Sequence, residues 1–418
     1  MGNISSIKKV GTISVFSLAM MNFAAVANLR NLPAMAVYGM SMLFFYGIAV
    51  VTFLIPTAVV SAELATGFPE EGGIFNWVNK AMGNRLGFLA VWLQNFTSFM
   101  LFPASLVYLA GVIAYVFQVP GLAHNNIYVL AVILLTTWIG TFVSLKGMQI
   151  ATVITNVGST LGTFIPGTLI IIFGILWIAT GRPSNMEFDV GSIIPKLSGP
   201  AQLVLFLNVM LGFSGLEMSA SHASDVKNPQ RDFPKAILLS SVLIFVLSML
   251  GSMAIAIAIP MKNLTLETGV IDTMDALLSS FGVRWLSPFM AGMMVFGMIA
   301  WFITWVSGPP RGMLATARTG NLPLILQKVN KGGMPSAIMI FQALCVTLIS
   351  FIFVLVPSVE TCFWILVAIS TQASLLMYIL MYISAIILRY KYPDVERGYK
   401  VPFGNIGMVT VCVIGILV

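Results

Sequence analysis

The chain is a succession of long apolar runs separated by short polar segments. A membrane-spanning helix needs about 20 mostly apolar residues, because the hydrocarbon core of a bilayer is about 30 Å thick. The last apolar run, residues 403–418, would reach only about 24 Å at about 1.5 Å per residue. We therefore expect the sequence to end inside an eleventh span. The runs that predict spanning helices are 11–36, 39–64, 86–118, 127–144, 150–179, 200–222, 234–259, 285–310, 335–356, 361–388 and 403–418.

Two of these runs contain polar and helix-breaking residues in their interiors. The first run includes Asn28, Arg30 and Pro33, and the sixth includes Gly212, Gly215 and Glu217. Such residues are costly in a membrane unless they face a cavity or a partner, so both helices are predicted to be interrupted. Interrupted helices at corresponding positions of two five-helix halves are typical of inverted-repeat transporters with a site at the bilayer midplane. The alternatives are close helix packing at the two glycines and a buried Arg30–Glu217 pair that only locks the bundle.

The composition agrees with a polytopic membrane protein. Hydrophobic residues make up 58% of the chain and charged residues only 8%, which leaves too few polar side chains to cover a soluble domain. The net charge of +7 is therefore interpreted as a signal of how the chain is oriented in the membrane. No nucleic-acid partner is expected. Two separated histidines and three isolated cysteines offer no metal-ligand spacing and no clustered catalytic groups, so we expect no metal, no cofactor and no enzyme.

The positions of the 21 Lys and Arg residues predict the orientation. Only Arg182, Lys196, Lys262 and Arg284 fall in the loops on one side, and Arg30 lies within a span. Positive charge accumulates on the cytoplasmic side of membrane proteins, so the N-terminus is predicted to be cytoplasmic. The residues assigned to the cytoplasmic side are Lys8, Lys9, Lys80, Arg85, Lys146, Lys227, Arg231, Lys235, Arg311, Arg318, Lys328, Lys331, Arg389, Lys391, Arg397 and Lys400.

Several short motifs carry a resemblance to a known family. They are the segments 62–66, 69–78, 215–222, 228–236, 305–313, 321–323 and 393–402. In this order and at these depths they resemble the amino acid–polyamine–organocation (APC) superfamily, and within it the bacterial glutamate/GABA antiporter group. The resemblance implies an all-α membrane protein with a ten-helix, leucine-transporter-like core of two inverted five-helix repeats, discontinuous helices 1 and 6, and a partial eleventh helix.

The resemblance divides the chain into a cytoplasmic N-terminus (1–10), a first repeat (11–179), an outer loop (180–199), a second repeat (200–388) and a loop with the partial helix (389–418). It implies a multi-pass protein of the bacterial inner membrane that exchanges a glutamate-like amino acid for a decarboxylated or neutral, GABA-like counterpart by alternating access. Its partners would be small amino acids and the lipid bilayer, and the oligomeric state is left open. The alternatives are a general amino acid or polyamine permease and a non-transporting amino acid sensor.

By the same resemblance, substrate contacts fall on the two helix breaks and on span eight. The expected substrate-binding residues are Ala25, Val26, Ala27, Asn28, Arg30, Leu211, Gly212, Phe213, Ser214, Gly215 and Trp305. Arg30 is included because of its charge and not because of the resemblance, since an arginine is not a general feature of this position in the family. A cation in this break favours an anionic or carboxylate-rich substrate, and it would repel arginine or a polyamine unless Glu217 neutralises it. Residues 147–181 contain no ionisable side chain, which excludes a lysine-based proton switch in span five and favours obligatory exchange.

Four further residues are predicted to act in gating or coupling. Glu217 is the acidic residue deep in span six, Glu70 and Glu71 occupy the loop after span two, and His222 ends span six. A histidine at a membrane boundary titrates near neutral pH, although an interfacial role without sensing is the alternative. The two loop glutamates are predicted to be charge partners of Lys80 or Arg85 in a gate network, and solvation in the loop is the alternative.

Overall fold

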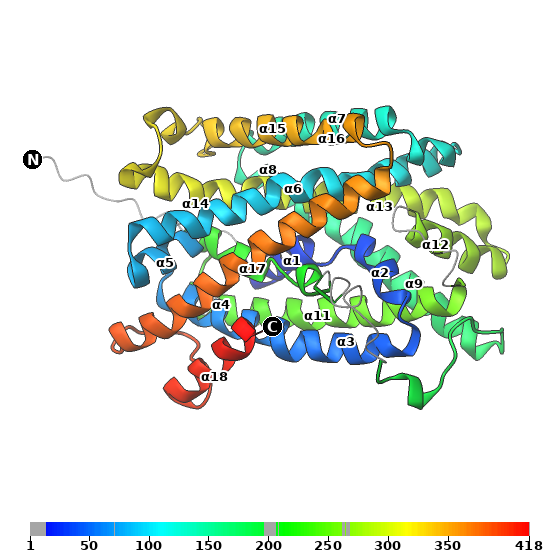
Figure 1. Cartoon of the computed structure of the whole chain (residues 1–418), viewed down its shortest axis with the longest axis horizontal. Coiled ribbons are helices and arrows are strands. Elements are labelled where there is room, and N and C mark those ends of the chain that lie inside the picture. Colours follow the sequence, from blue (N-terminus) through cyan, green and yellow to red (C-terminus); the bar gives the residue numbers. More distant parts are fainter. Residues whose placement is uncertain are drawn as a thin grey trace, which may run out of the picture.

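The computed structural model describes residues 14–70, 72–195, 206–207, 209–260, 264 and 268–417, with the side chains of 221–225 excepted. Almost all of the described chain is helical, and Figure 1 shows helices running between two ends that we call the α5 end and the α12 end. In the first half the helices are α1 (Val15–Val26), α2 (Leu32–Ala36), α3 (Met42–Ala49), α4 (Ile55–Gly67), α5 (Ile74–Met82), α6 (Asn84–Val116), α7 (Asn126–Ser144), α8 (Met148–Ser159) and α9 (Ile165–Ala179). In the second half they are α11 (Pro229–Ala258), α12 (Gly269–Ser280), α13 (Ser287–Ser307), α14 (Pro309–Thr316), α15 (Ser336–Ser350), α16 (Ile352–Leu355), α17 (Val359–Lys391) and α18 (Gly404–Leu417).

Eight helical stretches of the described chain are long and apolar enough to cross a membrane. They are Gly39–Gly67, Asn84–Val116, Asn126–Ser144, Met148–Ala179, Pro229–Ala258, Arg284–Asn321, Ser336–Leu355 and Val359–Lys391, and each matches a predicted span. The first predicted span is divided between α1 and α2, and α18 is the short apolar helix at the end of the chain. Part of the sixth span (200–205 and 208) lies outside the described residues.

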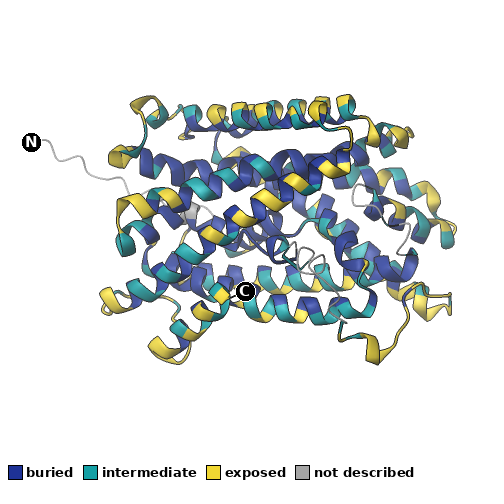
Figure 2. Ribbon diagram, in the orientation of Figure 1, coloured by how far each residue is buried: buried dark blue, intermediate teal, exposed yellow. Residues whose placement is uncertain are grey.

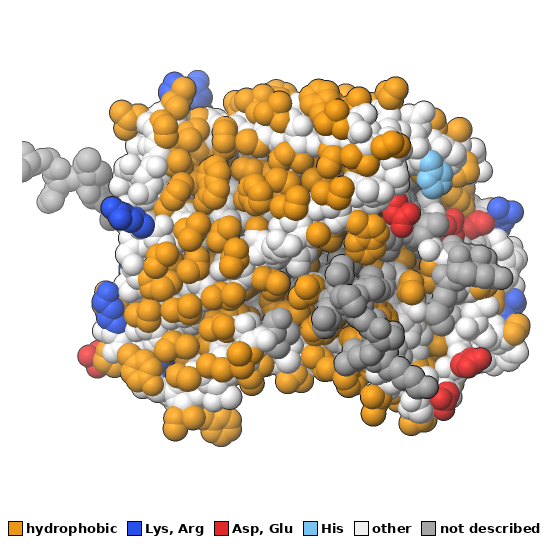
Figure 3. Space-filling view, in the orientation of Figure 1, with side chains coloured by type: hydrophobic (Ala, Val, Ile, Leu, Met, Phe, Trp, Pro, Cys, Tyr) orange, Lys and Arg blue, Asp and Glu red, His pale blue; other side chains and the backbone are white. Residues whose placement is uncertain are grey.

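The surface has the character of a protein embedded in lipid. Figure 3 shows a broad apolar band between the two ends, with Lys and Arg at the edge of the α5 end. On the outer helix α15, for example, Leu344 and Leu348 are 49% and 71% exposed, whereas buried residues fill the centre of the molecule in Figure 2. An exposed apolar surface of this extent is stable in a bilayer and not in water, so the chain is a multi-pass membrane protein.

The broken helix α1 lies at the centre of the molecule (Figure 1). It packs against α11, α8 and α13, and also against the 3₁₀ segment Leu216–Asp225 (η7) that follows the break in span six. The helices α4 and α11 pack on each other, and α4 also contacts η7. The elements α1, η7, α4 and α11 therefore form one connected group, which the long helices α6, α13 and α17 adjoin.

Candidate functional site

The first span is interrupted at Ala27 and Asn28, as the sequence predicts. Helix α1 ends at Val26, and both following residues have extended backbone, with φ −132° and ψ 119° at Asn28. The Asn28 side chain accepts a hydrogen bond of 3.1 Å from the Arg30 backbone N–H, which caps the short 3₁₀ turn Leu29–Asn31 (η1). Pro33 then lies in the first turn of α2, where a missing N–H has no cost.

The second break lies at residues 213–215, between the helical residues 209–212 and η7. Gly215 has φ +116°, a backbone conformation that favours glycine. A Cβ at this position would lie 3.2 Å from Trp305 Cζ2 and 3.3 Å from Val26 Cγ2. Glycine therefore allows the two breaks and α13 to approach one another closely.

A small cavity of about 20 Å³ lies where the two breaks meet. Its lining residues are Ala25, Val26, Asn28, Arg30, Asn31, Leu101, Leu211, Gly212, Ser214, Trp301 and Trp305. The Trp305 indole N–H donates a 2.8 Å hydrogen bond to the Ala25 carbonyl, which fixes α13 against the end of α1. The cavity has room for one water molecule and is far too small for an amino acid, so this conformation is closed around the breaks.

Arg30 is a buried cation with unpaired donors at this cavity. It is only 7% exposed, and within the described part of the chain its Nε and Nη1 atoms have no hydrogen-bond partner. The guanidinium carbon lies 5.6 Å from the ring centre of Phe363, a contact that compensates only part of the lost hydration of a cation. A buried guanidinium without an anion is unfavourable, so this position is suited to a ligand that brings a negative charge.

Glu217 has a separate set of partners. Its carboxylate accepts hydrogen bonds from the Tyr378 hydroxyl at 2.7 Å, the Gly215 N–H at 3.2 Å and the Gln94 amide at 3.4 Å. The Tyr378 hydroxyl in turn accepts a 2.9 Å hydrogen bond from the Gly215 N–H. This network connects the second break to α17 and α6. Within the described part of the chain no ion pair joins Glu217 to Arg30, so the structure does not contain the buried pair that the sequence left open.

The remaining predicted substrate residues lie in or beside the same region. Phe213 lines a neighbouring cavity together with Val26, Asn28 and Gly212, and Ala27 lines a third cavity beside Asn28 and Trp301. Gly215 lies so near Val26 and Trp305 that an added Cβ would meet both side chains. The structure thus brings every predicted substrate residue to the junction of the two breaks.

Two groups of neighbouring residues are absent from the sequence prediction. Trp301 and Leu101 line the cavity, and Trp301 precedes Trp305 by four residues, a helical spacing that places both on one face. This spacing is visible in the sequence, so Trp301 could have been predicted together with Trp305. Tyr378 and Gln94 lie within long apolar helices, and no local pattern distinguishes them from packing residues.

The structure describes the three other predicted gating residues, Glu70, Glu71 and His222, to different extents. Glu70 forms an exposed ion pair with Lys80, which is the pairing expected for a gate network, and its role in gating stays a prediction. Glu71 lies outside the described residues, and His222 belongs to η7 but its side chain is not among those described. In the part of the chain that the structure describes, no group of three His, Cys, Asp or Glu side chains is arranged to hold a metal ion.

Comparison with known proteins adds to this geometry. The family model described as amino acid permease matches residues 13–418. The chain is 39% identical over 98% of its length to an "uncharacterized transporter" of Legionella pneumophila, of which 88% is covered. It is 30% identical over 97% of its length to a glutamate/gamma-aminobutyrate antiporter of Lactococcus lactis (81% covered). A probable agmatine/putrescine antiporter of the same organism is 24% identical over 95% of the chain (84% covered).

Proposed function

Because the chain belongs to the amino acid permease family, whose members are membrane transporters of small molecules and not enzymes, we propose a specific form of transport. The protein is a secondary active antiporter that exchanges a glutamate-like amino acid for a decarboxylated or neutral, GABA-like counterpart. The observation that carries this proposal is the buried Arg30 guanidinium at the junction of the two helix breaks, whose Nε and Nη1 atoms have no hydrogen-bond partner among the described residues. The relative from Lactococcus lactis at 30% identity, a glutamate/gamma-aminobutyrate antiporter, supports the same substrate class.

We propose that Arg30 binds a carboxylate of the substrate. A carboxylate there would satisfy the unpaired Nε and Nη1 atoms, and charge-assisted hydrogen bonds are stronger than those between neutral groups. The backbone of the breaks would bind the common ends of the amino acid, since free N–H groups suit a carboxylate and free carbonyls suit an ammonium. Trp305, hydrogen-bonded to the Ala25 carbonyl, would close one side of this site.

We propose an alternating-access mechanism on a ten-helix core with inverted repeats at 11–179 and 200–388, followed by 389–418. Breaks in the first and sixth spans occupy corresponding positions of these halves, which supports a site between the repeats. The closed cavity of about 20 Å³ supports movement of the breaks, because an amino acid enters only after they separate. The network of Glu217, Tyr378 and Gln94 would couple this movement to α17 and α6.

We propose that the α5 end faces the cytoplasm of a bacterial cell, with residues 1–10 on that side and 180–199 outside. Most of the Lys and Arg residues fall in loops assigned to this side, as the positive-inside rule requires. The exposed Glu70–Lys80 pair lies at this end, and Glu71 and His222 remain proposed gating residues.

The test is uptake into liposomes that contain the purified protein. Vesicles preloaded with unlabelled glutamate are expected to take up labelled glutamate and GABA, and empty vesicles are expected to take up neither. Equal uptake into empty vesicles would contradict exchange. Uptake of putrescine or agmatine in place of glutamate would favour the polyamine alternative, and binding without flux would favour a sensor.

A further inference from the structure

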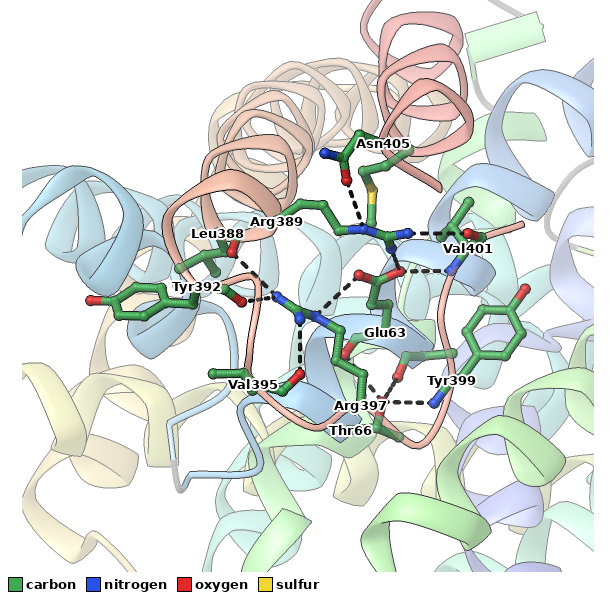
Figure 4. Close-up of polar contacts among 12 residues, drawn as sticks. Glu63, Thr66, Leu388, Arg389, Tyr392, Val395, Arg397, Tyr399, Val401 and Asn405 are labelled. Carbon is green, nitrogen blue, oxygen red and sulfur yellow. Dashed lines mark hydrogen bonds and ion pairs between the residues drawn. The ribbon is translucent and has the colours of Figure 1, made fainter. Parts of the chain in front are cut away.

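Figure 4 shows a cluster of three buried charged side chains, none of which lines the cavity at the breaks. Glu63 on α4 is 1% exposed, and Arg389 on α17 and Arg397 in the following linker are each 9% exposed. Glu63 Oε1 lies 3.2 Å from Arg397 Nε, and Glu63 Oε2 contacts Arg389 Nη1. The Val401 N–H donates a further hydrogen bond of 2.7 Å to Oε2. We call these three residues the ion cluster.

The other donors of the ion cluster are bound as well. Arg397 donates to the backbone carbonyls of Val395 and Tyr392, each at 2.9 Å, and to that of Leu388 at 3.2 Å. Arg389 donates to Asn405 on α18 at 3.3 Å. Burial lowers the pKa of the Arg397 guanidinium, and the carboxylate of Glu63 acts in the opposite direction. Opening the cluster would therefore leave two cations and an anion without partners in a buried environment, which is strongly unfavourable.

The linker 392–403 also joins α4 to α11. The Tyr399 N–H donates to Thr66 Oγ1 on α4 at 3.3 Å, and the Gln230 side chain on α11 donates to the Thr66 carbonyl at 2.7 Å. Gly398 packs against the Gln230 backbone so closely that a Cβ would lie 1.9 Å from the Gln230 carbonyl oxygen. One short linker thus holds the ends of α4, α11 and α17 together.

The helices held in this way are those next to the two breaks. In the chain α4 follows the interrupted first span, and α11 begins shortly after η7. None of the three charged residues lines the cavities at the breaks, where the unpartnered groups lie.

We propose that the ion cluster is a fixed pivot, so that Glu63, Arg389 and Arg397 position α4 and α11 throughout the cycle while the breaks move relative to it. This role rests on the alternating-access transport proposed above. It differs from a gate, whose ion pairs must open once in each cycle. A pivot is favoured because the two guanidinium groups are held by Glu63, by Asn405 and by backbone carbonyls. In addition, none of the three residues lines a cavity at the breaks.

The test is a covalent bond placed beside the cluster. In a background in which Cys345, Cys362 and Cys412 are replaced by Ala, Thr66→Cys is combined with Tyr399→Cys, which leaves all three charged side chains in place. Proteoliposomes are assayed for exchange before oxidation, after disulfide formation and after reduction, and each single-cysteine variant is oxidised as the control. The disulfide is expected to leave the initial rate of exchange unchanged.

Arrest of exchange by the disulfide, with recovery on reduction, would overturn the pivot, because the contact would then have to open. Absence of exchange in the cysteine-free parent would instead contradict the proposed function itself. A second variant separates a pivot from a purely structural contact. Glu63→Gln is expected to lower the maximal exchange rate per folded molecule at an unchanged half-saturating substrate concentration. An unchanged rate per folded molecule would overturn the proposal even if the yield of folded protein falls.

Discussion

Two regions of this molecule contain buried charged side chains, which are fully paired in one region and incompletely paired in the other. In the ion cluster, Glu63 is paired with Arg389 and Arg397, and the arginines also donate to backbone carbonyls (Figure 4). At the junction of the helix breaks, Arg30 is equally buried and two of its nitrogens have no partner. Asn22, on α1 of the same span, also has no hydrogen-bond partner for either amide atom among the described residues.

The difference separates the proposed positioning role of the ion cluster from the proposed ligand-binding role of Arg30. A fully paired cluster is most stable when it stays closed, whereas an unpaired buried cation stabilises whatever anion enters beside it. Removal of charge should therefore destabilise the first region and leave the second as stable as before. The predictions below follow from this contrast.

The largest effect is expected for Glu63→Gln. Two buried guanidinium groups would lose their counter-charge, which costs about 3–5 kcal/mol of unfolding free energy. Unfolding in mixed micelles measures this loss, and Glu70→Gln is the matched control. The Glu70–Lys80 pair is exposed, so its loss should cost less than about 1 kcal/mol. Equal effects of the two substitutions would refute the contrast between buried and exposed pairs.

A smaller effect is expected for Tyr378→Phe, which removes the 2.7 Å hydrogen bond to the Glu217 carboxylate. A hydrogen bond to a charged group contributes about 1.5–3 kcal/mol, so the same unfolding measurement should show a loss of this size. Tyr382→Phe is the control, because that hydroxyl only pairs with the neutral Thr57 hydroxyl at 2.8 Å. Its loss should be about 0.5–1.5 kcal/mol. If Tyr382→Phe lowers the unfolding free energy more than Tyr378→Phe does, the hydrogen bond from Tyr378 to Glu217 does not make the expected contribution to stability.

The two glycines of the second break should differ in their tolerance of a side chain. Gly215→Ala forces a residue with a Cβ into φ +116° and against Trp305, so we expect a loss of about 1–3 kcal/mol and reduced exchange. Gly212 has no positive φ, and its added Cβ would meet the Asn31 amide at 3.2 Å. Gly212→Ala should therefore be the milder change in thermal stability. Equal tolerance at both positions would argue against a strained turn at Gly215.

The smallest effect on stability is expected for Arg30→Met. Replacement of a buried, incompletely paired cation by an apolar side chain of similar length removes a desolvation cost, so unfolding free energy should stay the same or rise. The unfolding measurement used for Glu63→Gln gives a direct comparison. A loss as large as that of Glu63→Gln would indicate that Arg30 has a structural role.

The interrupted helices could be predicted from the sequence because their causes are local. Pro33 and the asparagines of span one, and Gly212 and Gly215 of span six, act on the backbone at their own positions. Arg30 stands out for a similar reason, since a single cation in an apolar run needs an explanation. The predicted substrate residues at the breaks accordingly lie together in the structure, although their role in binding stays a prediction.

The partners of the buried charges could not be predicted in this way. Tyr378 lies 161 residues from Glu217 in the chain, and Arg389 lies 326 residues from Glu63. No local pattern sets the register between helices so far apart. In addition, the sequence pattern assigns Arg389 and Arg397 to the positively charged cytoplasmic side. Only the three-dimensional structure shows that both side chains are buried against Glu63.

The most direct test of the account is the substrate preference of Arg30→Met in preloaded liposomes, measured beside the wild-type protein with labelled glutamate and labelled glutamine. If Arg30 binds the carboxylate that glutamate has and glutamine lacks, the half-saturating concentration for glutamate should rise by about 10–100-fold, which corresponds to the loss of a charged hydrogen-bonding partner. The value for glutamine should change little, and the variant should fold normally. A folded variant that takes up glutamate with the wild-type half-saturating concentration would contradict the account.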